Sequence, residues 1–364
     1  MSGYYGFHNA GDEAILGGII TAFRDLDPDV RFTVISGTSA YTRRVHGVEA
    51  VSRGDLKSIW RAMDRADLLI SGGGSLLQDV TGAKSIVYYL GVVGLGKLHR
   101  LPVMFYAQGI GPVTGMLGRT LLPVVGNTVD LVTVRDAESA EALRKLGVRR
   151  PETRVTADAA LVLSAPPRAA GEEVLDRFGI HLTKRPVIGV SVRPWKLASA
   201  GVALELARAL DDLAAQYDAT VLFVPMQQPH DVAAAQEVAT HMKAPAITFA
   251  GDVTYRDVQA LVACCDVLVG MRYHALVFAA LARVPMIGLS YDPKNDNLLR
   301  LLGQTAVGTA QDLSADRVKA AVSEALEHSG QIRQRYDQVL DRLVPESRQN
   351  AQLAMDLLKR WRKR

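Results

Sequence analysis

The strongest constraint on the fold of this chain is a rhythm of short β-branched runs separated by longer segments of helical periodicity. Strand candidates in the first half are Phe32–Ser36, Leu68–Ser71, Val103–Ala107 and Leu131–Val134. The helix candidates between and around them include Asp12–Leu26, Ser58–Arg65, Ile86–His99 and Ala137–Leu146. This order is typical of βαβ units, so it predicts an α/β protein with a parallel, doubly wound sheet.

The rhythm stops once, at the Pro- and Ala-rich segment Leu163–Val174, which indicates a domain linker. It resumes with the strand candidates Val187–Ser191, Thr220–Pro225, Ala246–Phe249, Asp266–Val269 and Met286–Ser290. We therefore expect two Rossmann-like domains, residues 1–165 and 166–313, with a ligand in an interdomain cleft at the carboxyl ends of the strands. Residues 314–364 are expected to form a helical tail that packs back on the N-terminal domain.

Composition is that of an ordinary globular protein, with 48% hydrophobic and 22% charged residues. The net charge of +4 is too small and too dispersed to favour nucleic-acid binding. Cys264 and Cys265 are adjacent in the strand-like run LVACCDVLVG, which favours core thiols in a reducing compartment over metal ligands. No export signal or membrane-spanning run is apparent, so we expect a cytoplasmic protein.

The start of the chain is unusual, because the glycine-rich segment GYYGFHNAGDE (residues 3–13) leads into a helix pattern with only Met1 and Ser2 before it. Such a loop normally follows a strand. We expect that strand either to be lost or to lie upstream, since a sheet without it would expose backbone donors and acceptors.

Two further glycine-rich segments follow strand candidates, SGGGSLLQD (71–79) and YAQGIGPVTG (106–115). Glycine lets the backbone approach a ligand closely, and consecutive amides can bind an anion. Each segment alone is equally well explained by tight packing. None has the lysine and hydroxyl of a P-loop, and the proline of GIGPVTG conflicts with a dinucleotide-binding fingerprint. Together the three predict a binding surface on the N-terminal domain.

Polar and cationic residues follow four strands of the second half. Arg193 follows the first strand. Gln227, His230 and Asp231 follow the second, Arg272 and His274 the third, and Asp292, Lys294 and Asn297 the fourth. The carboxyl ends of parallel strands share one edge of a sheet, so these residues predict a cationic rim. A rim of this kind suits a small, strongly anionic ligand.

Each cation has an ordinary explanation as well. Arg135, which ends a first-half strand in VTVRDAES, can pair with Asp136 or Glu138. His274 can be a hydrogen-bonded core histidine, and Lys294 can be solvated in a turn. Only the set as a whole favours a site. Metal-ligand spacing is not apparent, so we expect no metal and no cofactor.

Seven of these segments resemble, in order, the motifs of the polysaccharide pyruvyl transferase family, and most closely its cell-wall CsaB branch. They are GYYGFHNAGDEAIL, ISGGGSLLQD, YAQGIGP, VRDAES, PMQ, MRYHAL and YDPK. The resemblance extends from the first residues to about Asn297. Family members typically have leucine at the position of Tyr273 and a small or polar residue at that of His8, so a pocket wall is expected to differ.

The resemblance implies a GT-B-like pair of domains that transfers the pyruvyl group of phosphoenolpyruvate to a sugar as a ketal and releases phosphate. In the CsaB branch the acceptor is N-acetylmannosamine in a lipid-linked precursor of the secondary cell-wall polymer, and the ketal serves surface-layer anchoring. Phosphoenolpyruvate would be bound by Arg135, Arg193, Arg272, His274 and Lys294. Arg272 and His274 would be catalytic, with His274 either the general acid or only a phosphate ligand.

Acceptor recognition would fall to the N-terminal half. The candidate residues are Asn9, Asp12, Gly73, Gly74, Ser75, Asp79 and Gln108. Asp12 or Asp79 is a candidate general base. The basic end KRWRKR, Lys359–Arg364, either contacts the inner membrane face peripherally or is a solvated helix end.

Two rival functions fit the same rhythm of strands and helices. One is a GT-B glycosyltransferase that uses a nucleotide sugar, although MRYHAL and YDPK favour a smaller, doubly anionic donor. The other is a non-catalytic, two-lobed protein that binds a sugar or an anion. Phosphate release from phosphoenolpyruvate would separate the first rival from a pyruvyl transferase.

Overall fold

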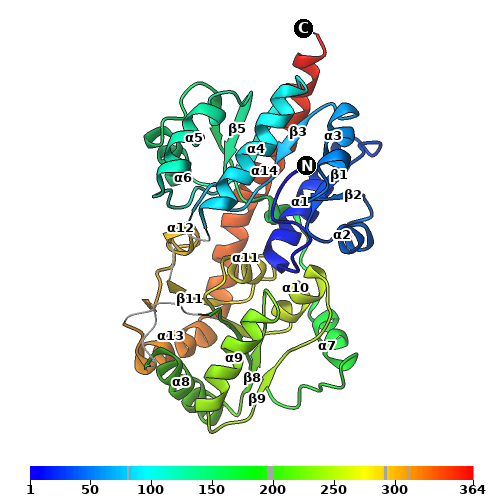
Figure 1. Ribbon diagram of the computed structural model, residues 1–364. Helices are drawn as coiled ribbons and strands as arrows, with labels where there is room; N and C mark the ends of the chain where they lie inside the picture. The colour runs from blue at the N-terminus through cyan, green and yellow to red at the C-terminus, as the bar shows by residue number, and fades with distance from the viewer. Residues whose placement is uncertain (80–81, 195–200, 291–292, 310–311, 364) are drawn as a thin grey trace. The chain divides into compact units, whose positions relative to one another are not determined.

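The computed structural model describes residues 1–79, 82–194, 201–290, 293–309 and 312–363 (Figure 1). The chain forms two compact units. Unit 1 comprises Met1–Phe7, Asp12–Leu163 and Leu343–Arg364, and unit 2 comprises His8–Gly11 and Ser164–Arg342. Helices α1 (Ala10–Leu26) and α14 (Ser329–Trp361) therefore contribute residues to both units.

Unit 1 is built on parallel strands with helices after most of them. Besides parts of α1 and α14, its elements are β1 Thr33–Ser36, α2 Ser39–His46, β2 Glu49–Ser52, α3 Leu56–Asp64, β3 Leu69–Ser71, α4 Ala83–Leu98, β4 Val103–Gln108, α5 Met116–Gly126, β5 Leu131–Val134, α6 Ala137–Lys145, β6 Glu152–Val155 and the 3-10 turn Ala159–Val162. Strands β3, β4, β5 and β6 follow one another in the sheet, and β1 pairs with β2.

The first two residues take the place of the strand that the sequence analysis expected before the first glycine-rich loop. Ser2 forms parallel bridges to Ile35 of β1 and to Ser71 of β3. The amide of Ser2 donates to the carbonyl of Ile70 (2.9 Å), and the amide of Gly72 donates to the carbonyl of Ser2 (2.7 Å). The strands on both sides of Ser2 are thereby joined, and the loop of residues 3–9 leaves the carboxyl edge.

Helices cover both faces of the unit 1 sheet. One face packs apolar residues of α3, α4, α5 and α6 against the buried strands. The other face receives α1 and the end of α14, where Phe23 contacts the ring of Tyr106 and Asn350 hydrogen-bonds Thr156 (2.8 Å). Helix α6 begins at Asp136, whose carboxylate accepts from the amide of Ser139 at 2.7 Å.

Unit 2 is a six-stranded parallel sheet in the order β12-β11-β10-β7-β8-β9. Its elements are α7 Arg168–Asp176, β7 Val187–Ser191, α8 Gly201–Tyr217, β8 Thr220–Phe223, α9 His230–His241, β9 Ala246–Thr248, α10 Tyr255–Ala263, β10 Val267–Gly270, α11 Tyr273–Leu281, β11 Met286–Ser290, α12 Pro293–Leu301, β12 Gly308–Thr309 and α13 Ala315–Glu327, with the first part of α14.

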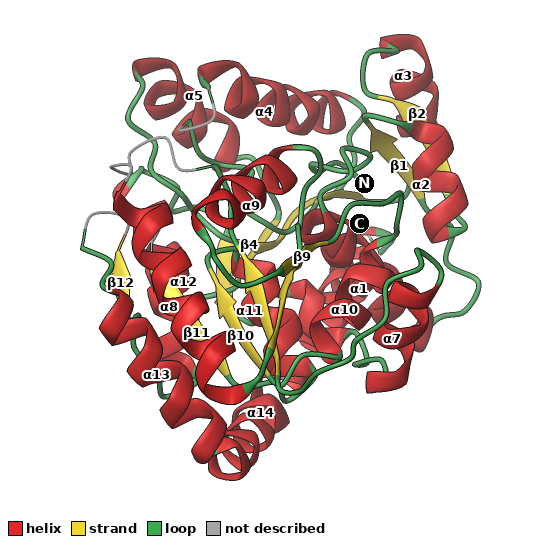
Figure 2. Ribbon diagram, turned by 90° about the horizontal axis from the view of Figure 1, so that it is seen from below, coloured by secondary structure: helices red, strands yellow, loops and turns green. Residues whose placement is uncertain are grey.

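The sheet of unit 2 is also covered on both faces (Figure 2). Helices α8, α9 and α13 bury apolar residues against β7, β8, β10 and β11. Helices α7, α10 and α11 pack on one another in the second layer. Burial on both faces explains why strands such as β7 and β11 consist of buried residues throughout.

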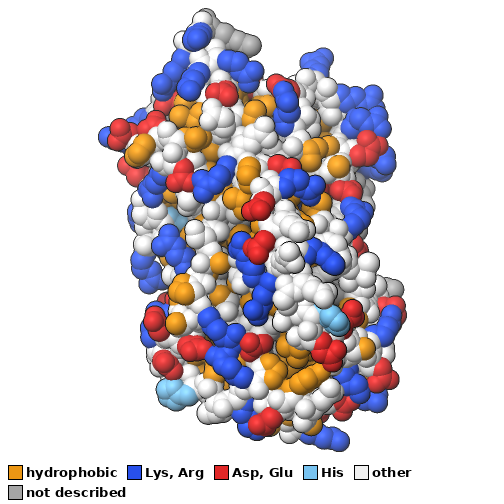
Figure 3. All heavy atoms as spheres, turned by 180° about the vertical axis from the view of Figure 1, so that it is seen from behind, with side chains coloured by type: hydrophobic (Ala, Val, Ile, Leu, Met, Phe, Trp, Pro, Cys, Tyr) orange, Lys and Arg blue, Asp and Glu red, His pale blue; other side chains and the backbone are white. Residues whose placement is uncertain are grey.

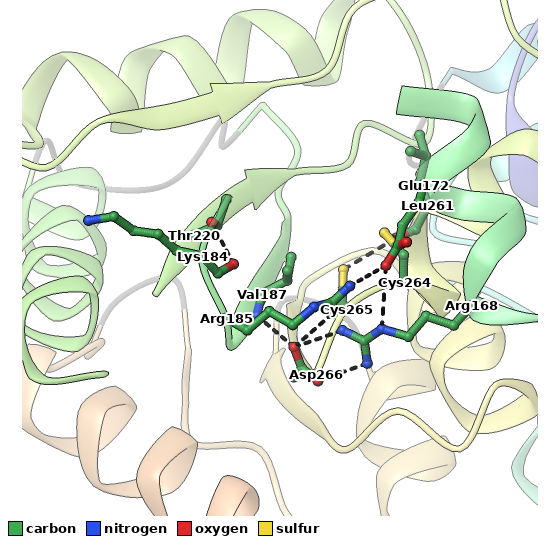
Figure 4. Close-up of polar contacts among 10 residues, drawn as sticks. All are labelled: Arg168, Glu172, Lys184, Arg185, Val187, Thr220, Leu261, Cys264, Cys265 and Asp266. Carbon is green, nitrogen blue, oxygen red and sulfur yellow. Dashed lines mark hydrogen bonds and ion pairs between the residues drawn. The ribbon is translucent and has the colours of Figure 1, made fainter. Parts of the chain in front are cut away.

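The segment Leu163–Val174, predicted as a domain linker, contains the boundary between the two units at Leu163 and Ser164, and helix α7 begins inside it at Arg168. The guanidinium of Arg168 donates two hydrogen bonds to Asp266 (2.8 and 2.9 Å), which also accepts from the amide of Val187 at 2.7 Å (Figure 4). This bidentate pair ties α7 to the amino ends of β7 and β10.

The two cysteines are buried and free, but they do not lie in a strand as LVACCDVLVG suggests. Cys264 caps the end of α10, and β10 begins only at Val267. Both thiols lie near the carbonyl of Leu261, at 3.1 and 3.3 Å (Figure 4). Hydrogen bonding to Cys264, together with burial, raises the pKa of Cys265.

The surface carries both charge signs. On the face drawn in Figure 3, basic and acidic side chains are interspersed among neutral and hydrophobic ones. This pattern agrees with the net charge of +4. In the described part of the chain, no helix combines the length and apolarity needed to cross a bilayer.

Candidate functional site

The carboxyl edge of the unit 2 sheet gathers four of the sequence-predicted positions. Strands β11, β10, β7 and β8 are neighbours in that order. The segments that follow them contain Lys294, Arg272, Arg193 and Gln227, respectively. Because the carboxyl ends of parallel strands share one edge, these residues lie along one edge of the sheet, where ligands of parallel α/β proteins bind.

Arg272 is held by the buried carboxylate of Asp231, which was expected at this strand end but not as a partner of Arg272. Its Nε donates to Asp231 at 2.9 Å, and its Nη2 also bonds this carboxylate. The side chain of Arg272 is 13% exposed and that of Asp231 is 0% exposed. Asp231 accepts two more bonds, from the amides of Met226 (3.0 Å) and Gln227 (2.9 Å). Because Nη1 takes no part in this pair, Asp231 fixes Arg272 while leaving one edge of the guanidinium for a ligand.

His274 lies in the first turn of α11, two residues after the N-cap Arg272. Its imidazole packs edge-to-face on the ring of Tyr273, with centroids 5.1 Å apart. The imidazole also lies against Gly11, where a Cβ would come within 2.3 Å of Nδ1. The backbone at Gly11 is anchored nearby, since the amide of Ala10 donates to the carbonyl of Met226 at 2.8 Å. Gly11 is thus a positioning residue for His274.

If His274 is the catalytic group that the sequence predicts, Gly11→Ala should lower kcat by about a hundredfold, because a displacement of roughly 1 Å at a reacting group costs about that much. The added methyl group would overlap Nδ1 of His274, so the imidazole must move away from residue 11. Steady-state kinetics on the variant test this. Gly330→Ala is the matched control, since a Cβ there meets nothing within 4 Å. Activity equal to wild type in Gly11→Ala would show that the position of His274 does not matter.

Lys294 is placed by its two neighbours in α12. The side-chain amide of Asn295, itself fully buried, donates to the carbonyl of Met271 at 2.5 Å. The hydroxyl of Ser290 donates to Asp296 at 3.0 Å. These bonds fasten the first turn of α12 to the ends of β10 and β11, beside the segment that carries Arg272.

Two parts of this edge lie outside the described residues. They are residues 291–292, which form the first half of the YDPK motif, and residues 195–200, which follow Arg193 closely. Arg193 itself is partly exposed after β7.

In unit 1 the glycine-rich loops are tied together at the carboxyl edge. The side-chain amide of Gln108, which is fully buried, donates to the carbonyls of Ser71 (3.2 Å) and Gly72. The amide of Gly109 donates to the carbonyl of Gly74 at 2.7 Å. Gly74 needs its φ of +88°, a conformation that side chains disfavour. Gln108 therefore supports the loop, and its predicted contact with a sugar stays a prediction.

The other two glycines of this loop are explained by packing. A Cβ at Gly72 would lie 1.9 Å from the hydroxyl of Tyr5, and one at Gly73 would lie 3.1 Å from Ile15. Ser75 is partly exposed, so its side chain is more accessible than those beneath it. Acceptor binding by Gly73, Gly74 and Ser75 stays a prediction.

Arg135 is buried among acidic groups of its own unit. Its Nη1 lies 3.3 Å from Asp158, its Nε 3.5 Å from Asp136, and its Nη2 3.4 Å from the hydroxyl of Ser75. The guanidinium also packs on Gly109, where a Cβ would come within 2.4 Å of it. Arg135 is only 6% exposed. This is the geometry of the ordinary ion pair weighed above, and donor binding by Arg135 stays a prediction.

Asp79 links two of the loops. Its carboxylate accepts from the amides of Thr114 (2.8 Å) and Gly115 (2.5 Å) and from the Thr114 hydroxyl (3.2 Å). The bond from the Gly115 amide is the main cause that lowers the pKa of Asp79. A carboxylate stabilised in this way is a poorer proton acceptor, which disfavours Asp79 as the general base.

The first glycine-rich loop is held from within the core of unit 1. Glu13, fully buried, accepts from the amide of Gly6 (2.7 Å) and pairs with Nε2 of His46 (2.8 Å). Asp12, which lies beside Gly74, is partly exposed. Asn9 belongs to unit 2, where it accepts from the amide of Gly11 at 3.0 Å at the start of α1.

Other features do not add to the site. A pocket of about 330 Å³, lined by Arg185, Pro186, Asp266, Leu326, Ser329 and Arg333, lies at the amino edge of the unit 2 sheet, away from the strand ends above. Among the described residues, no group of three or more His, Cys, Asp or Glu is arranged to hold a metal ion. A reaction without metal or cofactor stays a prediction.

Solved structures similar to this chain include two enzymes and a complex with UDP-glucose. A UDP-GlcNAc 2-epimerase from Neisseria meningitidis bound to UDP-GlcNAc superposes with a TM-score of 0.63 at 10% identity, covering 99% of both chains. Anabaena Alr3699/HepE in complex with UDP-glucose gives 0.59 at 14% identity, covering 100% of this chain and 97% of the other. E. coli ADP-heptose lps heptosyltransferase II gives 0.55 at 14% identity, covering 90% and 98%. Curated protein sequences give no match.

These likenesses define the class: the chain is an α/β protein of the GT-B-like fold, as the sequence predicts. Residues 9–293 match the polysaccharide pyruvyl transferase family. The chain belongs to that family, and the expectation that it is a transferase is confirmed at this level.

Proposed function

We propose that this protein transfers the pyruvyl group of phosphoenolpyruvate to a sugar of a lipid-linked cell-surface polysaccharide precursor, forming a ketal and releasing phosphate. The acceptor sugar we favour is N-acetylmannosamine, as in the cell-wall branch that the motifs resemble. The observation that carries the proposal is the arrangement after β10. Arg272, oriented by Asp231, stands at the N-terminus of α11, and His274 follows in its first turn.

Phosphoenolpyruvate carries a carboxylate and a phosphate on three carbons, so it needs several positive groups at fixed positions. The first turn of α11 supports this, because a helix N-terminus is a favourable place for an anion. We assign Arg272 to bidentate contact with one anionic group and Lys294 to the other. Arg193, on the neighbouring strand end, completes the proposed donor set of unit 2.

Chemically, His274 would donate a proton to the methylene carbon of phosphoenolpyruvate, which becomes a methyl group. The adjacent carbon then has oxocarbenium character and is attacked by one sugar hydroxyl, which loses its proton. The bond from that carbon to the phosphate oxygen breaks, and phosphate leaves with the electron pair. The second hydroxyl then attacks the same carbon and closes the ketal. Of the two hydroxyl protons, one restores the proton on His274 and the other leaves on the released phosphate. General acid catalysis of this kind contributes about 10²- to 10⁴-fold in rate.

Acceptor binding is proposed for the loops of unit 1. Asp12, Ser75 and the amides of Gly73 and Gly74 are the groups offered to sugar hydroxyls. Asp79 is the poorer candidate base because the Gly115 amide lowers its pKa. The basic end at Lys359–Lys363 is proposed for at most a peripheral contact with anionic lipid.

The test is whether the purified protein releases phosphate from phosphoenolpyruvate when, and only when, an amino-sugar disaccharide acceptor is present. Mass spectrometry of the acceptor should show the added pyruvyl group. Phosphoenolpyruvate left intact with every acceptor, combined with release of UDP from a UDP-sugar, would replace this proposal with a nucleotide-sugar glycosyltransferase. The nucleotide-sugar complexes among the solved structures make that second assay worthwhile.

A further inference from the structure

Unit 1 carries a stack of aromatic rings and one arginine that the proposed function does not use. The rings of Tyr4 and Phe7 are nearly parallel, 11° apart, with centroids at 4.3 Å. The guanidinium carbon of Arg53 lies 5.3 Å from the centroid of Phe7 and 4.3 Å from that of Tyr88. All four side chains are partly exposed.

The stack sits at the carboxyl edge of the sheet and is held by backbone bonds. Arg53 directly follows β2, and its amide donates to the carbonyl of Ser36, the last residue of β1, at 2.9 Å. Phe7 packs on Gly37, where a Cβ would lie 2.8 Å from its ring. The amide of Gly37 donates in turn to the carbonyl of Tyr5 at 2.8 Å. These contacts hold Phe7 and Arg53 at the carboxyl ends of β1 and β2.

Arg53 and Arg135 differ in how their charges are neutralised. Among the described residues Arg53 has no carboxylate partner, whereas Arg135 lies close to both Asp158 and Asp136. Stacking on rings engages the face of a guanidinium, and its N–H donors lie in the plane, where they suit a phosphate. Arg53 therefore offers a half-buried, oriented cation beside two accessible rings.

We infer that the Tyr4–Phe7–Arg53–Tyr88 stack binds the phosphate ester of the acceptor, with Arg53 on the phosphate and the rings against the apolar face of the attached sugar. The inference rests on the proposed function and adds to it the residues that would hold the phosphate or diphosphate that carries the acceptor glycan. A lipid diphosphate and a nucleoside diphosphate present the same chemistry to Arg53, so the experiment must separate them.

Calorimetric titration can test this without turnover, using one amino-sugar disaccharide in three forms. One carries a short prenyl diphosphate, the second a uridine diphosphate and the third a neutral alkyl group. In Arg53→Met we expect Kd for the diphosphate forms to rise by about 10- to 100-fold, the usual range for a lost charged hydrogen bond. In the same variant, Kd for the neutral form should change by less than about threefold. Tighter wild-type binding of the prenyl form would identify a lipid-linked acceptor, and tighter binding of the uridine form a nucleotide-linked one.

The control is Arg31→Met, which removes the same charge from an exposed arginine that precedes β1. It should leave all three values of Kd unchanged. Equal losses for the neutral and diphosphate forms in Arg53→Met would overturn the inference, as would weaker binding of phosphoenolpyruvate alone. Arg53→Lys, which keeps the charge but loses the planar fork, should fall between wild type and Arg53→Met and guards against a folding defect. Failure of the proposed function would appear separately, as wild-type protein that never consumes phosphoenolpyruvate.

Discussion

Replacement of His274 by glutamine should lower kcat by about 10²- to 10⁴-fold while leaving the Kd of phosphoenolpyruvate within about threefold of wild type. Glutamine preserves much of the bulk and can still hydrogen-bond, but it cannot donate a proton to carbon. The contact with Gly11 and the edge-to-face contact with Tyr273 hold the side chain in place, so the substitution should disturb its neighbours little. Stopped-assay kinetics and titration with phosphoenolpyruvate give the two values.

The comparison of the two losses decides the role of His274. If kcat and donor affinity fall by the same factor, His274 is an anion ligand and another group protonates the methylene carbon. Gly11→Ala provides an independent check, because it keeps the imidazole and only displaces it. It should reproduce part of the kcat loss.

Loss of Arg272 should weaken donor binding most. A bidentate arginine contributes two charged hydrogen bonds, each worth about 1.5–3 kcal/mol, so Arg272→Ala should raise the Kd of phosphoenolpyruvate by about 100-fold or more. Isothermal titration with the donor alone measures this. Unchanged affinity would remove Arg272 from the donor site.

Arg272→Ala also leaves Asp231 buried without its cation, which by itself destabilises a protein by about 3–5 kcal/mol. The double variant Asp231→Asn with Arg272→Met avoids that effect and should bind the donor as poorly as Arg272→Ala while melting closer to wild type. Asp231→Asn alone keeps the arginine but loosens its orientation, so donor affinity should fall less. A donor affinity in the double variant close to that of wild type would mean that misfolding, and not lost contact, explains the single variant.

The central strands were predictable because burial on both faces makes them continuous apolar runs. Strands β5, β7 and β11 have the bounds that the sequence indicates. Strands β2 and β6 were not predicted, since β6 is exposed at every residue and β2 at both ends. Helix α11 was missed for the opposite reason. It is buried at every position except His274, so it shows no helical periodicity.

Site positions were predictable where they depend on strand ends and not where they depend on pairing across the fold. Arg272 and His274 follow β10, as the sequence suggests. The partner Asp231 lies 41 residues away in sequence, and the Glu13–His46 pair spans 33 residues. Nothing in the local sequence distinguishes Asp231 from any acidic residue in the first turn of a helix. The sequence left the triple glycine open between ligand binding and tight packing, and packing against Tyr5 and Ile15 explains two of its members.

The central claim is that the pyruvyl carbon, and not phosphorus, is attacked. Phosphoenolpyruvate labelled with ¹⁸O in the oxygen that joins carbon to phosphorus tests it most directly, with the released phosphate analysed by mass spectrometry. Cleavage of the carbon–oxygen bond, as proposed, sends the label into phosphate. Unlabelled phosphate, with the heavy oxygen left on the three-carbon product, would contradict the account.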